Sequence, residues 1–320
     1  MLDNLVRVQN HFASLKAANC SPTLELDNAM NLAILKVVAL AENARKPGLN
    51  LQTFDSFSAF AQVLKSGVQA PFRGLIPMPN DSQHRLAVDV TFQDGKASII
   101  AVESMNIEGL PEHFDLHQLG MLAELPESAR MTVIASNAQM SQADCAIFAA
   151  SSALKMHENA ELFATMHRQQ FAGEPLGETA LKEDQDASEG RIGLVDGTSL
   201  LPAGFVKHAN SKTQLNAWLS VNGGAANVPA SSKRPDGPTL LSRHENLRVT
   251  RTGENGPKPM GISIEDKRMT LLSRCIRYLS QAPDNEVSMA LQSFERYTPD
   301  LDEKLHKAAP LVTGQIYRKP

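Results

Sequence analysis

The chain has 320 residues, 42% of them hydrophobic and 21% charged, with a formal net charge of -4 at pH 7. A chain of this size and composition can bury a full core, which excludes a largely disordered protein, and the charge argues against direct nucleic-acid binding. The longest apolar run, residues 32–41, is interrupted by Lys36 and is too short to span a membrane. The odd, sparse set of three cysteines does not suggest a disulfide framework, which favours a reducing compartment.

In chain order, helices come first. Residues 1–20 are a polar, helix-prone lead-in, and Ser21-Pro22 is a typical helix start. We expect one helix over residues 22–45 and a second over residues 56–65. The Pro- and Asn-rich segment 70–82 is expected to be a loop.

Strands follow. Residues 85–93 alternate apolar and polar, residues 96–103 are largely apolar, and Asp94-Gly95 between them predicts a hairpin turn. Residues 130–135 predict another buried strand. A polar segment then leads into an apolar helix over residues 145–155.

The C-terminal half is less regular. Residues 173–190 are acidic and loop-like, and residues 222–259, rich in Gly, Pro, Ser and Asn, predict a long irregular excursion. Helices are expected over residues 262–281 and about residues 286–294.

Four residues suggest cysteine-based acyl chemistry. Cys145 begins the apolar helix, whose positive end stabilises a thiolate, and Gln139 lies six positions earlier. His84 lies 10 positions before Asp94 and Glu103 lies 9 after it, so an antiparallel hairpin brings the two together. These residues would serve as nucleophile, oxyanion donor, base and orienter. Taken singly, a buried cysteine, a surface histidine and a strand-end acid are ordinary structural residues; the joint arrangement indicates an enzyme.

This arrangement resembles the YopJ family of type III secreted effector acetyltransferases, whose fold is like that of the CE-clan SUMO-specific cysteine proteases. The resemblance covers about residues 24–281. It is carried by His84 with Val88-Asp89-Val90 after it, Glu103, the Gln139-to-Cys145 spacing, the segment Leu201–His208 and Lys267-Arg268. One departure is Ala146, where related cysteine enzymes often carry glycine.

The resemblance implies an α+β fold, with a central mixed sheet flanked by helices and a C-terminal helical regulatory lobe. We expect a lead-in over residues 1–20, a catalytic core over residues 21–220 and a basic regulatory region over residues 221–320. Residues 1–20 look too helical for a disordered secretion signal, which leaves the presence of a natural leader open.

The resemblance also implies a ping-pong reaction. The Cys145 thiolate attacks acetyl-CoA, and His84, oriented by Glu103, then deprotonates a Ser, Thr or Lys side chain that takes the acetyl group. Gln139 and the backbone N–H near Cys145 would hold the oxyanion. The implied partners are signalling or immune proteins in the cytoplasm or nucleus of a host cell, whose immune signalling the protein would suppress.

Residues 201–280 carry twelve Lys and Arg against five Asp and Glu. A solvated helix face with a polar loop would explain this, but the resemblance implies a basic pocket for the activator inositol hexakisphosphate. The candidate ligands are Lys267, Arg268, Arg274 and Arg277, the Tyr278 hydroxyl, and Arg45 or Lys46.

Three arginines, Arg243, Arg248 and Arg251, are candidates for the phosphates of CoA on composition alone. Lys207 matches the lysine that family members acetylate on themselves, but it is equally a candidate basic ligand, and His208 is placed with it at the cofactor sites.

Two other functions remain open. A ubiquitin-like-protein isopeptidase would use the same triad. SUMO-specific proteases, however, carry a tryptophan after the catalytic histidine, where this chain has Arg85, and its one tryptophan is Trp218. A non-enzymatic binding protein is disfavoured because all four catalytic residue types are present.

Overall fold

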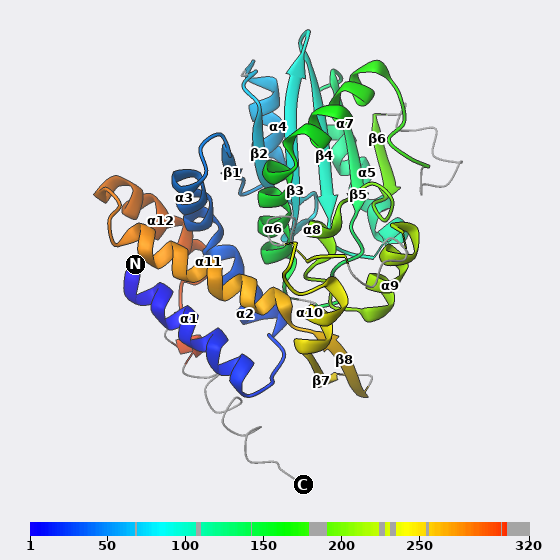
Figure 1. Cartoon of the computed structure of the whole chain (residues 1–320). Coiled ribbons are helices and arrows are strands. Elements are labelled where there is room, and N and C mark those ends of the chain that lie inside the picture. The colour runs from blue at the N-terminus through cyan, green and yellow to red at the C-terminus, as the bar shows by residue number, and fades with distance from the viewer. Residues whose placement is uncertain are drawn as a thin grey trace.

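The computed structural model describes residues 1–67, 69–106, 110–141, 143–178, 191–223, 228–230, 235–253, 256–301 and 303–305. At its centre lies a six-stranded mixed sheet whose spatial order follows the chain (Figure 1). Its strands are β1 (Leu51–Thr53), β2 (Phe72–Met78), β3 (Asp81–Gln93), β4 (Lys96–Glu103), β5 (Ala129–Ala135) and β6 (Ile192–Asp196).

Strand direction changes across the sheet. β1 and β2 are parallel, β2, β3 and β4 are antiparallel neighbours, and β4, β5 and β6 run parallel. The carboxyl ends of β4, β5 and β6 therefore meet at one edge of the sheet. Open sheets commonly bind ligands at such an edge. The expected α+β fold with a mixed sheet is confirmed.

The predicted hairpin is confirmed. Asp94 and Gly95 adopt φ values of 52° and 74°, as a two-residue hairpin turn requires, and Gln93 pairs with Lys96. This register places the start of β3 beside the end of β4.

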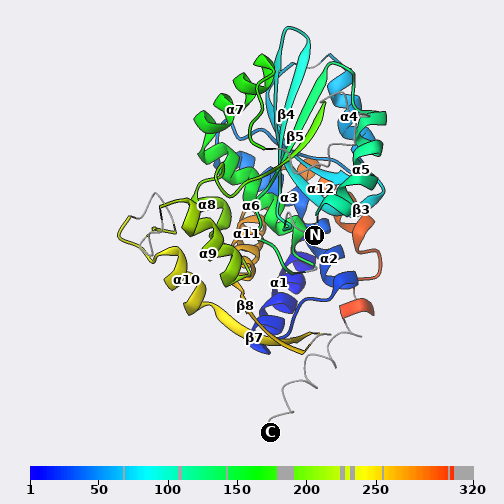
Figure 2. The same ribbon diagram turned by 90° about the vertical axis from the view of Figure 1, so that its right-hand side faces the viewer.

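Helices cover both faces of the sheet (Figure 2). One face packs against α6 (Cys145–Glu158) and α7 (Ala160–Ala172), and the other against α4 (Phe57–Lys65) and α5 (Leu110–Glu124). The alternation of β4 explains the two cores, since Ile100 joins the first and Ile99 the second.

The expected single helix over residues 22–45 is two helices, α2 (Leu24–Ala33) and α3 (Leu35–Arg45). The backbone bond from Val38 N–H to Ile34 O, at 2.9 Å, carries the hydrogen bonding across the junction. Thr23 is the N-cap residue of α2 in place of the predicted Ser21, and its backbone N–H donates to the Asp27 carboxylate.

The prediction of a loop over residues 70–82 is wrong, because this segment holds β2 and the start of β3. Its prolines and asparagine suggested a break in regular structure. Pro77, however, lies where the β2–β3 register shifts, and strands tolerate proline at such irregularities.

The prediction of an irregular segment over residues 222–259 is also wrong. It contains α10 (Leu240–Asn246), β7 (Arg248–Gly253) and most of β8 (Gly256–Gly261), and the two strands form an antiparallel hairpin. Of the acidic segment 173–190, residues 179–190 lie outside the described part.

The remaining helices are α1 (Leu2–Ala17), α8 (Ala203–Val206), α9 (Lys212–Val221), α11 (Ser263–Leu279) and α12 (Asp284–Tyr297). The predictions for α11 and α12 are confirmed. α11 packs on α1, α3 and α6, so the C-terminal region lies against the N-terminal helices (Figure 1). Across the described ranges, none of the helices has the length and apolar character that crossing a bilayer requires.

Candidate active site

His84 and Glu103 meet where β3 begins and β4 ends. The His84 Nε2 atom lies 2.5 Å from Glu103 Oε2, and the carboxylate side chain is 1% exposed. The other carboxylate oxygen, Oε1, accepts from the backbone N–H of Met105 at 2.8 Å. The structure therefore brings this predicted pair into contact, with the carboxylate fixed by the strand end.

Cys145 is the first residue of α6, and its side chain points into the same place. Its Sγ lies 3.5 Å from Gln83 O and 3.8 Å from Asn28 Oδ1, and the thiol also hydrogen-bonds to the His84 side chain. Because Gln83 directly precedes His84, the helix start and the strand start are held together at the thiol.

The raised pKa of His84 suits a group that takes the proton of the neighbouring Cys145 thiol. Burial by itself lowers the pKa of His84, but the charge of Glu103 and the hydrogen bonds to Cys145 and Glu103 outweigh it and hold the pKa well above its usual range. An imidazolium next to a thiol favours the thiolate, which is the nucleophilic form.

Gln139 lies within the same network but does not contact Cys145 in this state. Its side-chain Oε1 accepts from the Ser104 hydroxyl at 2.6 Å, and its Nε2 donates to Ser141 O at 2.6 Å. Ser104 also donates to Glu103 Oε1 at 3.4 Å, so one hydroxyl joins the predicted oxyanion donor to the triad acid.

Sequence reasoning missed several residues of this site. Asn28 and Asn31 of α2 are buried, as is Ser104 after β4, and each bonds to a residue around the nucleophile. A signal existed for the first two, because they form a polar stripe with Asp27 on an otherwise apolar helix. Such buried polar side chains require partners.

A second site is a basic pocket of about 270 Å³. Six of the predicted polyanion or cofactor residues line it, together with Lys155 and Glu158 of α6, which the sequence analysis did not name. The six are Arg45, Lys46, Lys207, His208, Lys267 and Arg274. They come from α3, the end of α8 and α11, which are distant in sequence.

Two carboxylates partly neutralise this pocket. Glu158 lies 2.8 Å from Lys46 Nζ and 2.6 Å from Lys155 Nζ, and the two ammonium groups lower its pKa against the effect of burial. Glu42, which is buried, pairs with Arg45 and with Arg274.

Lys207 and Lys267 are the lysines of the pocket whose protonated forms are destabilised. Burial and the charges of Lys155 and Arg243 lower the pKa of Lys207 to about 8. Burial and Arg274 lower the pKa of Lys267 to about 7, although Glu42 opposes the shift. A bound anion would relieve this repulsion.

The other candidate ligands lie elsewhere. Arg268 and Arg251 are buried in ion pairs with Asp144 and Glu265, so the prediction that they face a polyanion or CoA is corrected. Their carboxylate partners hold them inside the protein.

Four more candidates lie outside the residues that line the pocket: Arg243, Arg248, Arg277 and Tyr278. Arg243 Nε donates to Ser263 Oγ at 2.9 Å, and this hydroxyl also bonds His208 of the pocket. Arg248 pairs with Glu245, Tyr278 bonds Glu286, and Arg277 is exposed.

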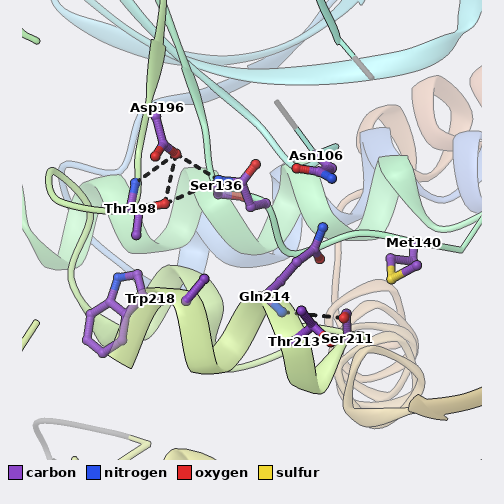
Figure 3. A pocket seen from close by; sticks show the side chains of 11 residues that line it. Asn106, Ser136, Met140, Asp196, Thr198, Ser211, Thr213, Gln214 and Trp218 are labelled. Atoms are coloured by element: carbon purple, nitrogen blue, oxygen red, sulfur yellow. Dashed lines mark hydrogen bonds between the residues drawn. The ribbon is translucent and has the colours of Figure 1, made fainter. Parts of the chain in front are cut away.

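A third feature is a polar pocket of about 420 Å³ at the carboxyl ends of β4, β5 and β6 (Figure 3). Asn106 and Ser136 follow β4 and β5, Asp196 is the last residue of β6, and α9 forms the opposite wall with Gln214 and Trp218. The Asp196 carboxylate accepts from Asn137 and Thr198. Among the described residues, the lining combines hydroxyl and amide side chains with the Asp196 carboxylate and holds no lysine or arginine, so it suits a polar group without negative charge.

This pocket adjoins the triad through the backbone. The N–H of Ser136, which lines the pocket, donates to Glu103 O at 2.7 Å, and Met140 on its rim follows Gln139 directly. The carboxyl edge of the sheet thus carries both Glu103 and the cavity.

Solved structures with this fold come from bacterial effectors. HopZ1a in complex with IP6 aligns with a TM-score of 0.71 and 22% identity, over 88% of this chain and 97% of that one. AvrA with IP6 and CoA aligns with a TM-score of 0.68 and 20% identity, over 86% of this chain and 98% of that one.

The proteins related in sequence include the same HopZ1a. HopZ1a of Pseudomonas syringae pv. syringae, a serine/threonine-protein acetyltransferase, is 28% identical over 245 residues, which are 68% of this chain and 65% of that protein. A serine/threonine-protein acetyltransferase of Sinorhizobium fredii is 25% identical over 169 residues, which are 52% of this chain and 65% of that protein. The chain thus spans about two thirds of the length of these relatives.

The sequence signature of the family described as YopJ Serine/Threonine acetyltransferase matches residues 1–274, which include every residue of the site around Cys145. With the fold and the relatives in agreement, this chain belongs to the YopJ serine/threonine acetyltransferase family.

Proposed function

We propose that the protein transfers acetyl groups from acetyl-CoA to hydroxyl groups of serine or threonine in other proteins. The observation that carries the proposal is the contact of Cys145, at a helix N-terminus, with a histidine whose Nε2 lies 2.5 Å from a buried glutamate. The family description and the named relatives supply the substrate class.

The reaction would proceed in two halves. The Cys145 thiolate attacks the thioester carbonyl, a C–S bond to Cys145 forms, and the CoA thiolate leaves with a proton from His84. The neutral imidazole then accepts the proton of the acceptor hydroxyl as its oxygen attacks the acetyl-Cys145 carbonyl, and the C–S bond to Cys145 breaks, which returns the site to its thiolate–imidazolium pair. Glu103 stabilises the imidazolium before the first half and after the second.

The oxyanion of each half needs donors near Cys145. The first-turn N–H groups of α6 are suited to this role because the N-cap residue Asp144 makes no capping hydrogen bond to them. Gln139 would join them after a small rotation that exchanges Ser141 O for the oxyanion.

The polar pocket is the proposed site of the uncharged pantetheine arm of acetyl-CoA. The hydroxyl and amide side chains that line the pocket can hydrogen-bond to the two amide groups of that arm. The pocket lies at the edge of the sheet that carries Glu103. Of the three arginines predicted for the CoA phosphates, Arg243 remains a candidate, because its Nε atom shares the Ser263 hydroxyl with His208 of the basic pocket.

The basic pocket is the proposed site of inositol hexakisphosphate (IP6) as an activator. Five Lys and Arg side chains that were predicted as ligands, with Lys155, surround a cavity in which burial and then neighbouring positive charges lower the pKa values of Lys207 and Lys267. HopZ1a and AvrA, which share the fold, have structures with IP6. Lys207 keeps two proposed roles, as an anion ligand and as a site of self-acetylation.

We further propose that the protein acts as a bacterial effector inside a host cell, where its acceptors are signalling or immune proteins and its effect is to suppress immune signalling. The family membership supports this proposal.

The decisive test is transfer of label from radioactive acetyl-CoA to the protein itself, with and without IP6, for the wild type and for Cys145→Ala. Label that requires both Cys145 and IP6 would support the whole proposal. Label without IP6 dependence would keep the chemistry and remove the activator. No label, with cleavage of ubiquitin-like substrates, would replace the transferase by an isopeptidase.

A further inference from the structure

Arg268 of α11 is the largest side chain among those fully buried in the described part of the protein, at 1% exposure. A buried guanidinium is costly unless it is paired and hydrogen-bonded, so its contacts should show what it supports. The triad and the basic pocket, as described above, do not include it.

The contacts of Arg268 converge on the approach to the nucleophile. Its Nη2 donates to the Asp144 carboxylate, its Nε donates to Asn31 Oδ1 at 2.8 Å, and its guanidinium lies 4.2 Å from the centre of the Phe12 ring. Asn31 in turn donates from Nδ2 to Ala143 O at 2.7 Å. The two residues that directly precede Cys145 are therefore both held, one by Arg268 and the other by its partner.

The ion pair also determines what caps α6. Asp144 is the N-cap residue, and an aspartate there ordinarily accepts from a first-turn N–H. Its side chain makes no such bond, and the carboxylate is bonded to Arg268 instead. The positive helix end is thus left to the Cys145 thiolate and to the oxyanion.

We propose that Arg268 is a positioning residue for Cys145, which holds the Asp144 carboxylate away from the start of α6 and neutralises its charge beside the thiolate. The proposal rests on the proposed acyl transfer through Cys145. Without Arg268, the carboxylate would cap the helix or face the thiolate, and both outcomes disfavour the reactive form.

The test is the rate at which iodoacetamide alkylates Cys145 as a function of pH, followed by mass spectrometry of the peptide that contains Cys145. Arg268→Gln should move the alkylation profile to higher pH by about one unit and lower kcat by roughly tenfold, with KM for acetyl-CoA little changed. Asp144→Asn should move the profile to lower pH. The alkylation profile of the double variant Arg268→Gln, Asp144→Asn should lie near that of the wild type, because neither residue then carries an unpaired charge.

Opposite shifts that cancel in the double variant are a result that a merely structural role does not produce. Arg277→Gln, on the exposed face of the same helix, is the matched control and should behave as the wild type. Binding of IP6 reports that α11 is in place, since Lys267 and Arg274 of this helix line the basic pocket.

An Arg268→Gln variant that binds IP6, melts cooperatively and keeps the wild-type alkylation profile would overturn the proposal. If Arg268→Gln does not fold, Asp144→Asn decides alone: an unchanged profile overturns the proposal, and a shift to lower pH supports it. Alkylation of Cys145 needs no acetyl-CoA. If the variants show the predicted shifts in alkylation but the wild type transfers no acetyl group, the proposed function is contradicted and the positioning role stays intact.

Discussion

At the residue scale, the proposed chemistry depends on one ion pair, that of His84 with Glu103. Glu103 is almost completely buried and touches a histidine that is itself only 14% exposed, so its charge acts through little solvent. This charge raises the pKa of His84, and an imidazolium beside a thiol favours the thiolate.

Glu103→Gln should therefore slow acetyl transfer by roughly 10³- to 10⁴-fold, as loss of the carboxylate does in other triads. Because the raised pKa of His84 depends on the carboxylate, the imidazolium is lost at lower pH in the variant, and alkylation of Cys145 should require higher pH. The measurement is single-turnover acetylation together with an alkylation profile. Glu127→Gln, at an exposed position, is the control; equal profiles for both variants would contradict the role of Glu103.

A second residue-scale prediction concerns the lysines of the basic pocket. In the free protein Lys267 and Lys207 lose protons near pH 7 and pH 8, and a bound polyanion would raise both pKa values, so binding takes up protons. The affinity for IP6 should fall by about tenfold between pH 7 and pH 8.5. Calorimetry in buffers of different ionisation enthalpy measures the uptake.

The double variant Lys207→Met, Lys267→Met should flatten this pH dependence, which separates it from the ionisation of IP6 itself. Lys65→Met, exposed on α4, should keep the wild-type slope. A slope that is unchanged in the double variant would show that other groups take up the protons.

At the scale of elements, α6 joins the two sites. Cys145 is its first residue, and Lys155 near its other end lines the basic pocket, so a rise of about 1.5 Å per residue separates the two by about 15 Å. α2 supports the same helix from the side, because its buried Asn28 and Asn31 bond to Cys145 and to Ala143 O.

Asn28→Ala should lower the rate of acetyl transfer by roughly tenfold, the equivalent of about 1.4 kcal/mol for one lost hydrogen bond in the site. IP6 binding should be unchanged, because Asn28 does not line the basic pocket. Steady-state kinetics and calorimetry check the two halves of this prediction. Asn10→Ala, at an exposed position of α1, is the matched control, and equal rates for both variants would remove Asn28 from the site.

The helix α9 offers a test of the polar pocket. Ala217 is exposed and lines the pocket, so Ala217→Trp should fill part of the cavity without disturbing the core. We expect KM for acetyl-CoA to rise by roughly tenfold or more, with alkylation of Cys145 unchanged. Asn216→Trp, exposed on the same helix but outside the lining, should leave KM alone. If KM is the same in both variants, the pantetheine arm binds elsewhere.

At the scale of the whole molecule, the basic pocket joins segments from four parts of the chain, so an anion bound there would tie them together. Ligand bound only to the folded state stabilises it by about 2.7 kcal/mol at 100 times Kd. For a domain of this size we expect Tm to rise by roughly 5 °C, measured by calorimetry with IP6. Arg274→Gln should reduce the rise, and a full rise in this variant would place the anion outside the pocket.

The sequence by itself determined the features that depend on local geometry. The turn at Asp94-Gly95 set the register that brings His84 to Glu103, and the polar-to-apolar change at Cys145 placed the thiol at a helix start. Both follow from backbone preferences over a few residues. The same reasoning misjudged residues 70–82, since proline also occurs where a strand is irregular, as Pro77 does in β2.

Only the tertiary structure decided which charged residues face a cavity and which are buried with a partner. Lys267 and Arg268 are neighbours on α11 with the same charge, yet Lys267 lines the basic pocket and Arg268 is bonded to Asp144 inside the core. Composition cannot separate them, because the difference lies in the direction of each side chain around the helix and in the carboxylates of Glu42 on α3 and Asp144 at the start of α6. His84 and Glu103 belong to the same hairpin, so local geometry brings them together. Arg268 reaches Asp144 only when segments that are distant in sequence pack against each other.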